Sequence, residues 1–173
     1  MSENNEHVHT TESDHNESVE KVRELISDIR IAMLTTLDAD GAPHSRPMYT
    51  QQTEFDGDLW FTTSKSSSIV RELRANPTVC VNYSNPDSQR FVVIAGEAVV
   101  VHDQAKINEL WNPSLKMWFK GGPTDPDLTL VKVESRRADF WDSPAAPVRW
   151  FQFLAGVATG KRPSSDARGA VDL

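Results

Sequence analysis

One stretch of the sequence gathers the chemical groups that bind a phosphate. Residues 61–68 read Phe-Thr-Thr-Ser-Lys-Ser-Ser-Ser, in which six hydroxyl residues surround one lysine. The apolar run before them and the helical spacing after them predict a strand that leads into the start of a helix. Neutral donors, a cation and the free amides of a helix start suit a phosphate. We therefore predict phosphate binding here; a polar loop with a redundant helix cap is the alternative.

Arg46 is the second candidate group. It stands two residues from Met48, so both side chains lie on one face of a predicted strand. Burial of an unpaired guanidinium inside a barrel is energetically costly, so an inward Arg46 would require an anionic partner. The alternative is an Arg46 that faces solvent. His44 and Tyr49 lie on either side of it, and we interpret His44 as a surface residue rather than a catalytic base.

Aromatic residues are concentrated in the last third of the chain. They are Trp111, Trp118, Phe119, Phe140, Trp141, Trp150, Phe151 and Phe153. Together with the Gly-Gly-Pro and Asp-Pro breaks between them, they suit the wall of a ring-shaped ligand or the contact surface of a dimer. Packing in the core is the alternative for each one taken singly.

The familiar catalytic and metal-binding motifs are missing from the sequence. It has no Gly-x-Ser-x-Gly, no His-Glu-x-x-His, no dinucleotide-binding Gly-x-Gly-x-x-Gly and only one cysteine, Cys80, in an apolar run. We interpret Cys80 as a small buried hydrophobe and the His7-Val8-His9 stretch as solvated, and we predict no metal site. An enzyme built on this chain would depend on the reactivity of a cofactor.

Composition and charge limit the class of protein. Five of the 25 acidic residues lie in residues 1–17, which contain no lysine or arginine and no apolar period. We predict that 1–17 is a disordered acidic tail, that 18–160 forms one domain and that 161–173 is a mobile tail. The remaining 18 basic and 20 acidic residues form no basic run, which argues against nucleic-acid binding. Without a membrane-spanning run or a secretory signal, we expect a cytoplasmic protein.

Local patterns place the elements that must position these groups. A helix is expected from Ser18, which would cap it, with an apolar face from Val19 to Ile29. Further helices are expected at 67–75, 103–111 with Asp103 as cap, and 149–156; an ordered loop with a helical turn is expected at 112–127. The expected strands are 31–37, 43–52, 59–63, 78–84, 91–102, 128–134 and 138–141. Short turns between most strands predict a mainly antiparallel sheet with flanking helices, closed or partly open as a barrel; a sandwich fits the same pattern.

Two motifs, Ser45-Arg46-Pro47-Met48 and the run from Leu59 to Ser66, resemble the pyridoxamine 5'-phosphate oxidase-like superfamily. The second half of the chain is similar to the general stress protein 26 branch of that superfamily. Three stretches carry this similarity: Trp118-Phe119-Lys120-Gly121-Gly122-Pro123-Thr124-Asp125-Pro126-Asp127-Leu128, Ala138-Asp139-Phe140-Trp141-Asp142 and Gly156-Val157-Ala158-Thr159-Gly160-Lys161-Arg162-Pro163. The resemblance covers about residues 19–173.

The resemblance implies an antiparallel split β-barrel that forms a homodimer, with flavin mononucleotide (FMN) at each of two subunit interfaces. It implies that Arg46, Pro47 and Met48 touch the ribityl chain, the phosphate or the ring. It places Phe61, Thr62, Thr63, Ser64 and Ser66 at the phosphate end, with Lys65 and Ser67 beside them. It also implies that Trp118 and the loop after it cover the ring, from the same or the other subunit.

The sequence departs from the family in two places. Many relatives follow the serine equivalent to Ser66 with one or two basic residues on the phosphate, where this chain has Ser67 and Ser68. Lys65, Arg46 and Arg71 would then have to neutralise the phosphate, and flavin would bind more weakly. The vitamin oxidases also end in an Arg-x-His substrate element that this chain lacks, so we do not expect it to oxidise pyridoxamine phosphate.

These observations predict a flavin-dependent oxidoreductase of unknown substrate, linked to the stress response, that exchanges electrons with a small molecule. The alternatives are a flavin-binding protein without turnover, the same barrel with flavin adenine dinucleotide (FAD), a deazaflavin or haem, and a purely structural dimer. Expected partners are a second copy of the chain and the electron donor or acceptor.

Overall fold

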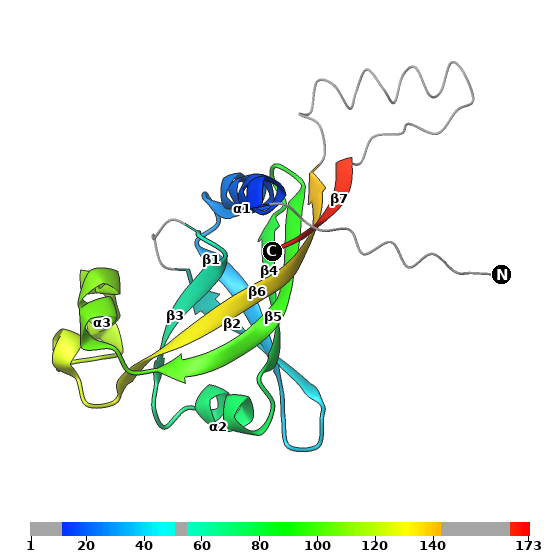
Figure 1. Ribbon diagram of the computed structural model, residues 1–173. Helices are drawn as coiled ribbons and strands as arrows, with labels where there is room; N and C mark the ends of the chain where they lie inside the picture. The colour runs from blue at the N-terminus through cyan, green and yellow to red at the C-terminus, as the bar shows by residue number, and fades with distance from the viewer. Residues whose placement is uncertain (1–11, 51–54, 143–166) are drawn as a thin grey trace, which may run out of the picture.

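The computed structural model describes residues 12–50, 55–142 and 167–173. Its centre is a seven-stranded antiparallel sheet in the order β2-β1-β4-β5-β6-β3, with β7 paired to β6 (Figure 1). The strands are β1 (Ile31–Leu37), β2 (Pro43–Tyr49), β3 (Asp58–Ser64), β4 (Thr78–Asn85), β5 (Arg90–Val101), β6 (Leu128–Asp142) and β7 (Ala167–Asp172). This is the mainly β, antiparallel architecture that the short turns predict.

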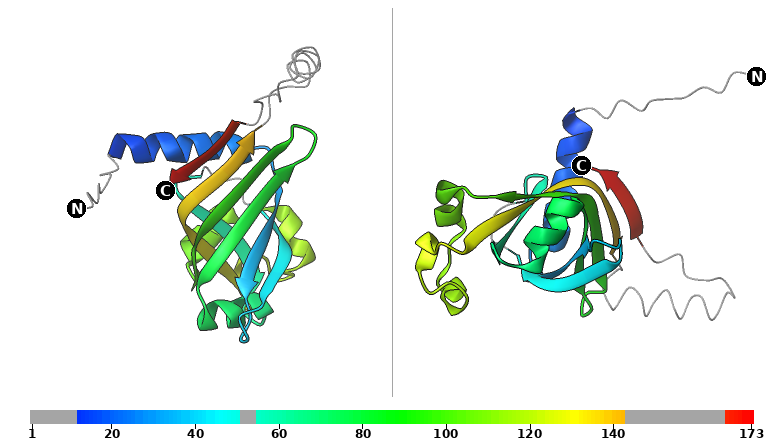
Figure 2. Two further views of the ribbon diagram at one scale, coloured as in Figure 1. Left: turned by 90° about the vertical axis from the view of Figure 1, so that its right-hand side faces the viewer. Right: turned by 90° about the horizontal axis from the view of Figure 1, so that it is seen from below.

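The sheet curls around a core but does not close. Strand β6 pairs with β5 along its length, with β3 through its first half and with β7 through its second half. The strands at the two ends of this order, β2 and β3, face one another across the curl, and no ladder joins them within the described residues. Viewed from below in Figure 2, the strands surround the interior on most sides. The barrel is therefore partly open rather than closed.

Helices cover the two ends of the curled sheet (Figure 1). Helix α1 (Glu12–Ile26) lies over one end and α2 (Ser68–Ala75) over the other. The strands show the burial of every second residue that an inward and an outward face require. Their inward side chains form the main core, which includes Leu34, Phe61, Val81, Ile94, Val131 and Val133.

Helix α1 begins earlier than its apolar period predicts. It starts at Glu12, and the Ser18 hydroxyl donates to the backbone oxygen of Asp14 instead of capping the helix. The residues before Val19 extend past the core, so they can be helical without an apolar face. The spacing of apolar residues that predicts a start at Ser18 therefore marks only the part of the helix that is buried. Residues 12–17 of the predicted disordered tail are therefore helical; residues 1–11 lie outside the described part.

The two strands predicted at 128–134 and 138–141 are one strand, β6. The register against β5 shifts between Ala95 and Gly96, which pair with Arg137 and Ser135 and leave Arg136 as an extra residue. Such a bulge changes which residues face inward without ending the strand. Val133 and Ala138 are both buried for this reason, although they are an odd number of residues apart. The break in the alternation of apolar and polar residues therefore predicted two strands where the backbone forms one.

The C-terminal segment predicted as mobile contains strand β7. Its register runs from Ala167 opposite Asp142 to Asp172 opposite Arg137, and Val171 and Leu173 pack against the main core. The prediction of a mobile tail is therefore wrong for residues 167–172. The helix predicted at 149–156 lies outside the described residues.

A second, smaller apolar cluster lies where the chain leaves β5 and returns to β6. Helix α3 (Gln104–Leu110) begins after Asp103, whose carboxylate accepts the amides of Ala105 and Lys106 as predicted. Two short 3-10 helices, η1 (Pro113–Met117) and η2 (Gly122–Thr124), follow. The cluster consists of Ile107, Leu110, Leu115, Phe119, Leu128 and Leu130, with Trp60 against it. None of the helices described here has the length and apolar character needed to cross a membrane.

Candidate functional site

The junction between β3 and α2 places the predicted phosphate-binding hydroxyls at a helix start. Ser67 is the N-cap of α2, and its Oγ accepts the amide of Val70. The Thr63 hydroxyl donates to the same oxygen over 3.1 Å. Helix geometry gives the first amides of α2 no intrahelical acceptor, so those of Ser68 and Ile69 point out of this end of the helix. The junction thus offers hydroxyl and amide donors on one side.

The serines before the cap are joined to a turn far along the chain. The Ser64 hydroxyl donates to the carboxylate of Asp127 and lies 2.7 Å from the Ser66 hydroxyl. The Lys65 amide donates to the backbone oxygen of Asp127, and its ammonium donates to that of Pro126. Asp125 holds this turn by accepting the amides of Gly121 and Asp127. The serine run is therefore a supported structure rather than a free polar loop.

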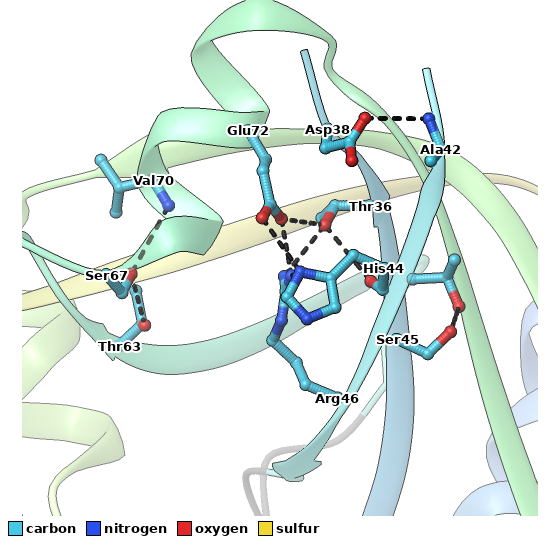
Figure 3. A network of polar contacts seen from close by, with 11 residues as sticks. Thr36, Asp38, Ala42, His44, Ser45, Arg46, Thr63, Ser67, Val70 and Glu72 are labelled. Atoms are coloured by element: carbon cyan, nitrogen blue, oxygen red, sulfur yellow. Dashed lines mark hydrogen bonds and ion pairs between the residues drawn. The ribbon is translucent and has the colours of Figure 1, made fainter. Parts of the chain in front are cut away.

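Arg46 points inward from β2 into a polar cluster between β1, β2 and α2 (Figure 3). Its Nη1 donates to the Thr36 hydroxyl over 2.9 Å, and its Nη2 lies 2.6 Å from Oε2 of Glu72. Nδ1 of His44 lies 2.6 Å from the same Nη2 and 3.1 Å from Oε1 of Glu72. The alternative of an Arg46 that faces solvent is wrong, because its side chain is only 15% exposed and that of Glu72 only 11%.

The carboxylate of Glu72 remains ionised at all ordinary pH values. Burial alone would raise its pKa, but hydrogen bonds from Thr36, Arg46 and His44, together with the charge of Arg46, outweigh burial and lower the pKa to about 2. The anionic partner that an inward Arg46 requires is thus part of the protein. Sequence reasoning missed Glu72, although its position beside Leu73 and three residues after Ile69 places it at the edge of the apolar face of α2.

The other predicted residues occupy several environments. The side chains of Met48 and Phe61 are buried in the main core, so only their backbone atoms are available to a ligand. Pro47 lies on the exposed outer face of β2. Thr62 lies on the outer face of β3, between the buried Phe61 and Thr63. The structure therefore brings Thr63 and the serines together at the start of α2, and keeps Pro47 and Thr62 on the other face of the sheet.

Trp118 follows η1 and lies apart from the polar cluster. Its ring packs on that of Tyr49, with centroids 5.7 Å apart and planes tilted by 54°. Both side chains are more than half exposed, and Tyr49 faces outward at the end of β2, whereas Arg46 faces inward. The aromatic pair thus links the edge strand β2 to the segment that carries α3 and η1, on the outer side of the barrel.

The hydrogen-bond donors at the β3–α2 junction are of the chemical types that bind a phosphate group. Hydroxyls of Thr63, Ser64, Ser66 and Ser67 lie beside the amides of a helix start, with Lys65 and Arg71 as adjacent cations. The carboxylates of Asp127 and Glu72 reduce the positive charge of this region. The junction therefore suits a phosphate held mainly by neutral donors and only partly by cations.

The chain is similar to known proteins in both sequence and fold. The sequence profile of the family described as "Pyridoxamine 5'-phosphate oxidase like" matches residues 17–164. A crystal structure from Jannaschia sp. CCS1, assigned to general stress protein 26, superposes with a TM-score of 0.76 at 21% identity and covers 91% of this chain and 99% of its own. The general stress FMN/FAD binding protein of Xanthomonas citri is 31% identical, with a TM-score of 0.64 and coverages of 76% and 92%.

A curated enzyme matches over a shorter stretch. The pyridoxine/pyridoxamine 5'-phosphate oxidase of Chromobacterium violaceum is 40% identical over 68 residues, which are 39% of this chain and 32% of the enzyme. The match therefore spans about a third of that relative.

Proposed function

This chain belongs to the pyridoxamine 5'-phosphate oxidase-like family, and from that membership we propose that it binds a flavin nucleotide, FMN first of all, and serves in redox chemistry. The observation that carries the proposal is the set of hydroxyls and helix-start amides at the β3–α2 junction. Its chemistry suits the phosphate of FMN, and a solved relative of 31% identity is described as an FMN/FAD binding protein.

We assign separate roles to the residues of the junction. Ser66 and Ser67 would donate to the phosphate oxygens, and Thr63 and Ser64 would join them by turning their hydroxyls away from Ser67 and Asp127. Lys65 would supply a positive charge beside them. The first amides of α2 would donate to the same oxygens. Arg46 of β2 is paired with Glu72, so it would act on the phosphate only as one half of a neutral pair. For the rest of the flavin, the contacts implied by the resemblance remain predictions. They involve the backbone of Met48 and Phe61, the outward-facing Pro47 and Thr62, and Trp118.

The flavin would supply an electron-accepting ring, and the protein would position it and exclude water from it. The exposed Tyr49–Trp118 pair offers aromatic surface of the kind on which a planar ring packs. The proposed activity is that of an oxidoreductase with a small-molecule electron donor or acceptor, located in the cytoplasm and linked to the stress response.

A flavin-binding protein without turnover is the second candidate. Three cations at or beside the junction are already engaged by the protein: Lys65 donates to the oxygen of Pro126, Arg71 to that of Ser66, and Arg46 to Glu72. Groups held in this way position a ligand more readily than they transfer protons. This candidate predicts a stable flavin spectrum with no oxidation of reduced nicotinamides above the rate of free flavin.

We also propose that the chain forms a homodimer through the outer face of β2, β1 and β4. The outward positions of these strands carry no charged side chain, and several are apolar and exposed. They are Ile31, Met33, Thr35, Leu37, Pro43, Ser45, Pro47, Tyr49, Thr78, Cys80, Asn82 and Ser84. An uncharged face across three neighbouring strands is what a contact between two copies requires, since charged residues are depleted at interface cores.

A titration tests the proposed binding. Purified protein, stripped of small molecules, is titrated into FMN, FAD and riboflavin, and quenching of flavin fluorescence gives the three dissociation constants. We expect saturable binding of FMN, with a visible absorbance spectrum shifted from that of the free flavin. Absence of saturable binding to all three flavins would remove the proposal. If FMN binds, a subsequent assay with reduced nicotinamides separates the oxidoreductase from the non-catalytic candidate.

A further inference from the structure

The pair formed by Glu72 and Arg46 places a permanent negative charge beside the cation that the family resemblance assigns to the flavin. Resting on the flavin binding proposed above, we propose that Glu72 is a specificity-determining residue: it cancels the charge of Arg46 and thereby sets how strongly the site prefers phosphorylated flavin to riboflavin.

The geometry shows that the Arg46 guanidinium is committed to the protein. Its Nη2 lies 2.6 Å from Oε2 of Glu72, and its Nη1 donates to Thr36, a residue with no exposed surface. Thr36 also donates to Glu72, which closes a three-membered network across β1, β2 and α2. Each contact fixes the guanidinium on the carboxylate. The cation therefore acts on its surroundings as one half of a neutral pair.

Helix α2 carries both the junction and part of the network: Glu72 follows the N-cap Ser67 by five residues, a rise of about 7.5 Å along the helix axis. Figure 3 shows the Arg46 cluster to one side of α2 and the Thr63–Ser67 pair near the start of the same helix. Ser67 caps the helix whose second turn carries Glu72. Charges separated by about one Debye length, roughly 10 Å or less, still interact, and the interaction is stronger where water is partly excluded.

The effect of the Glu72–Arg46 pair on the affinity for a ligand depends on the charge of that ligand. A phosphate monoester carries between one and two negative charges at neutral pH, whereas riboflavin carries none. With Glu72 ionised, its pKa being about 2, the phosphate meets a neutral pair and draws its affinity from hydroxyls, amides and Lys65. Without the carboxylate, the same phosphate would meet a net positive charge. Riboflavin would bind equally well in both cases.

The Glu72→Gln variant tests this inference directly. Glutamine keeps the size of the side chain and an oxygen for Thr36 and Arg46 but removes the charge. We expect FMN to bind about five- to tenfold more tightly, and riboflavin to change less than about twofold. The matched control is Glu20→Gln, which removes the same charge from the Glu20–Arg23 pair on α1, at the opposite end of the barrel. It should leave both constants unchanged.

A second variant keeps the test decisive if Glu72→Gln does not fold. In the double variant Arg46→Gln, Glu72→Gln, both charges are gone and the pair stays neutral. The inference predicts that the ratio of the FMN and riboflavin dissociation constants equals that of the wild type. If Arg46 instead binds the phosphate directly despite Glu72, the double variant loses affinity for FMN alone, and the inference is wrong. Circular dichroism and thermal unfolding without flavin establish which variants are folded.

The outcomes separate this inference from the proposed function. A wild-type protein that binds neither FMN nor riboflavin removes the proposed function. A wild-type protein that binds FMN, together with a folded Glu72→Gln variant whose FMN-to-riboflavin ratio is unchanged, removes only the role of Glu72. Tighter FMN binding in Glu72→Gln, with riboflavin unaffected, supports both.

Discussion

Nη2 of Arg46 lies 2.6 Å from Oε2 of Glu72, and this contact joins the edge strand β2 to helix α2 at one end of the barrel. Among the strands that the structure describes, β2 forms a ladder with β1 alone, so its other side depends on side-chain contacts. The ion pair holds the edge strand against the helix that covers the core. The same contact therefore bears on stability as well as on the charge of the candidate site.

The low pKa of Glu72 predicts a loss of stability in acid. The folded protein holds the pKa at about 2, whereas an unfolded glutamate titrates near 4.5, so the unfolded state takes up the proton at higher pH. The stabilisation is present above about pH 4.5 and is lost as the pH falls toward 2. We expect the free energy of unfolding to decrease by up to about 3 kcal/mol across this range on account of Glu72 alone. Urea unfolding at a series of pH values measures it.

The Glu72→Gln variant lacks the contribution of the Glu72 carboxylate to the free energy of unfolding. Its curve of unfolding free energy against pH should therefore be flatter between pH 5 and 2. The Glu20→Gln control should retain the slope of the wild type, since Glu20 is exposed. Parallel curves for the wild type and Glu72→Gln would contradict the assignment.

Ser67→Ala should destabilise the protein by about 1 kcal/mol, because it removes the acceptor for the Val70 amide at the start of α2. It also removes the acceptor of the Thr63 hydroxyl, which is nearly buried. The shift of the urea midpoint measures the loss. Ser27→Ala is the control, since that hydroxyl only donates to the Glu24 carbonyl at an exposed helix end; an equal loss in both variants would show that the cap is unimportant.

Gly96→Ala should cost about 2–3 kcal/mol, or prevent folding. A Cβ atom at this position would lie 2.2 Å from the backbone oxygen of Glu134, and that oxygen belongs to the β5–β6 ladder and cannot move aside freely. The neighbouring Ala95→Ser, at an exposed position of the same strand, should change stability by less than about 0.5 kcal/mol. Thermal unfolding of the two variants gives the comparison, and a Gly96→Ala protein as stable as the wild type would exclude the close approach.

Met33→Asp should convert the proposed homodimer to a monomer. Met33 lies at the middle of β1, opposite Pro47 of β2 and Asn82 of β4, and its side chain is 39% exposed. A charge there would be buried without a partner in the dimer and solvated in the monomer. Light scattering coupled to gel filtration gives the mass. Val99→Asp, at an exposed apolar position of β5 beyond the end of β4, is the control and should keep the wild-type mass.

Local periodicity in the sequence was sufficient for much of the fold. The strands at 31–37 and 78–84, the helix at 67–75, the cap Asp103 and the antiparallel order of neighbouring strands appear in the structure close to their predicted positions. These features depend on backbone geometry over a few residues, which side-chain patterns report directly. The bulge at Arg136 shows the limit of such patterns, because one extra residue reverses the alternation while the strand continues.

The candidate site depends on contacts that no local pattern contains. Glu72 is 26 residues from Arg46, and Asp127 is 63 residues from Ser64. The sequence alone determined that Arg46, if it pointed inward, needed an anionic partner and that the serine run would open a helix. Only the tertiary structure decided that the partner is a carboxylate of the protein itself, because the order in which distant strands and helices pack sets which side chains meet.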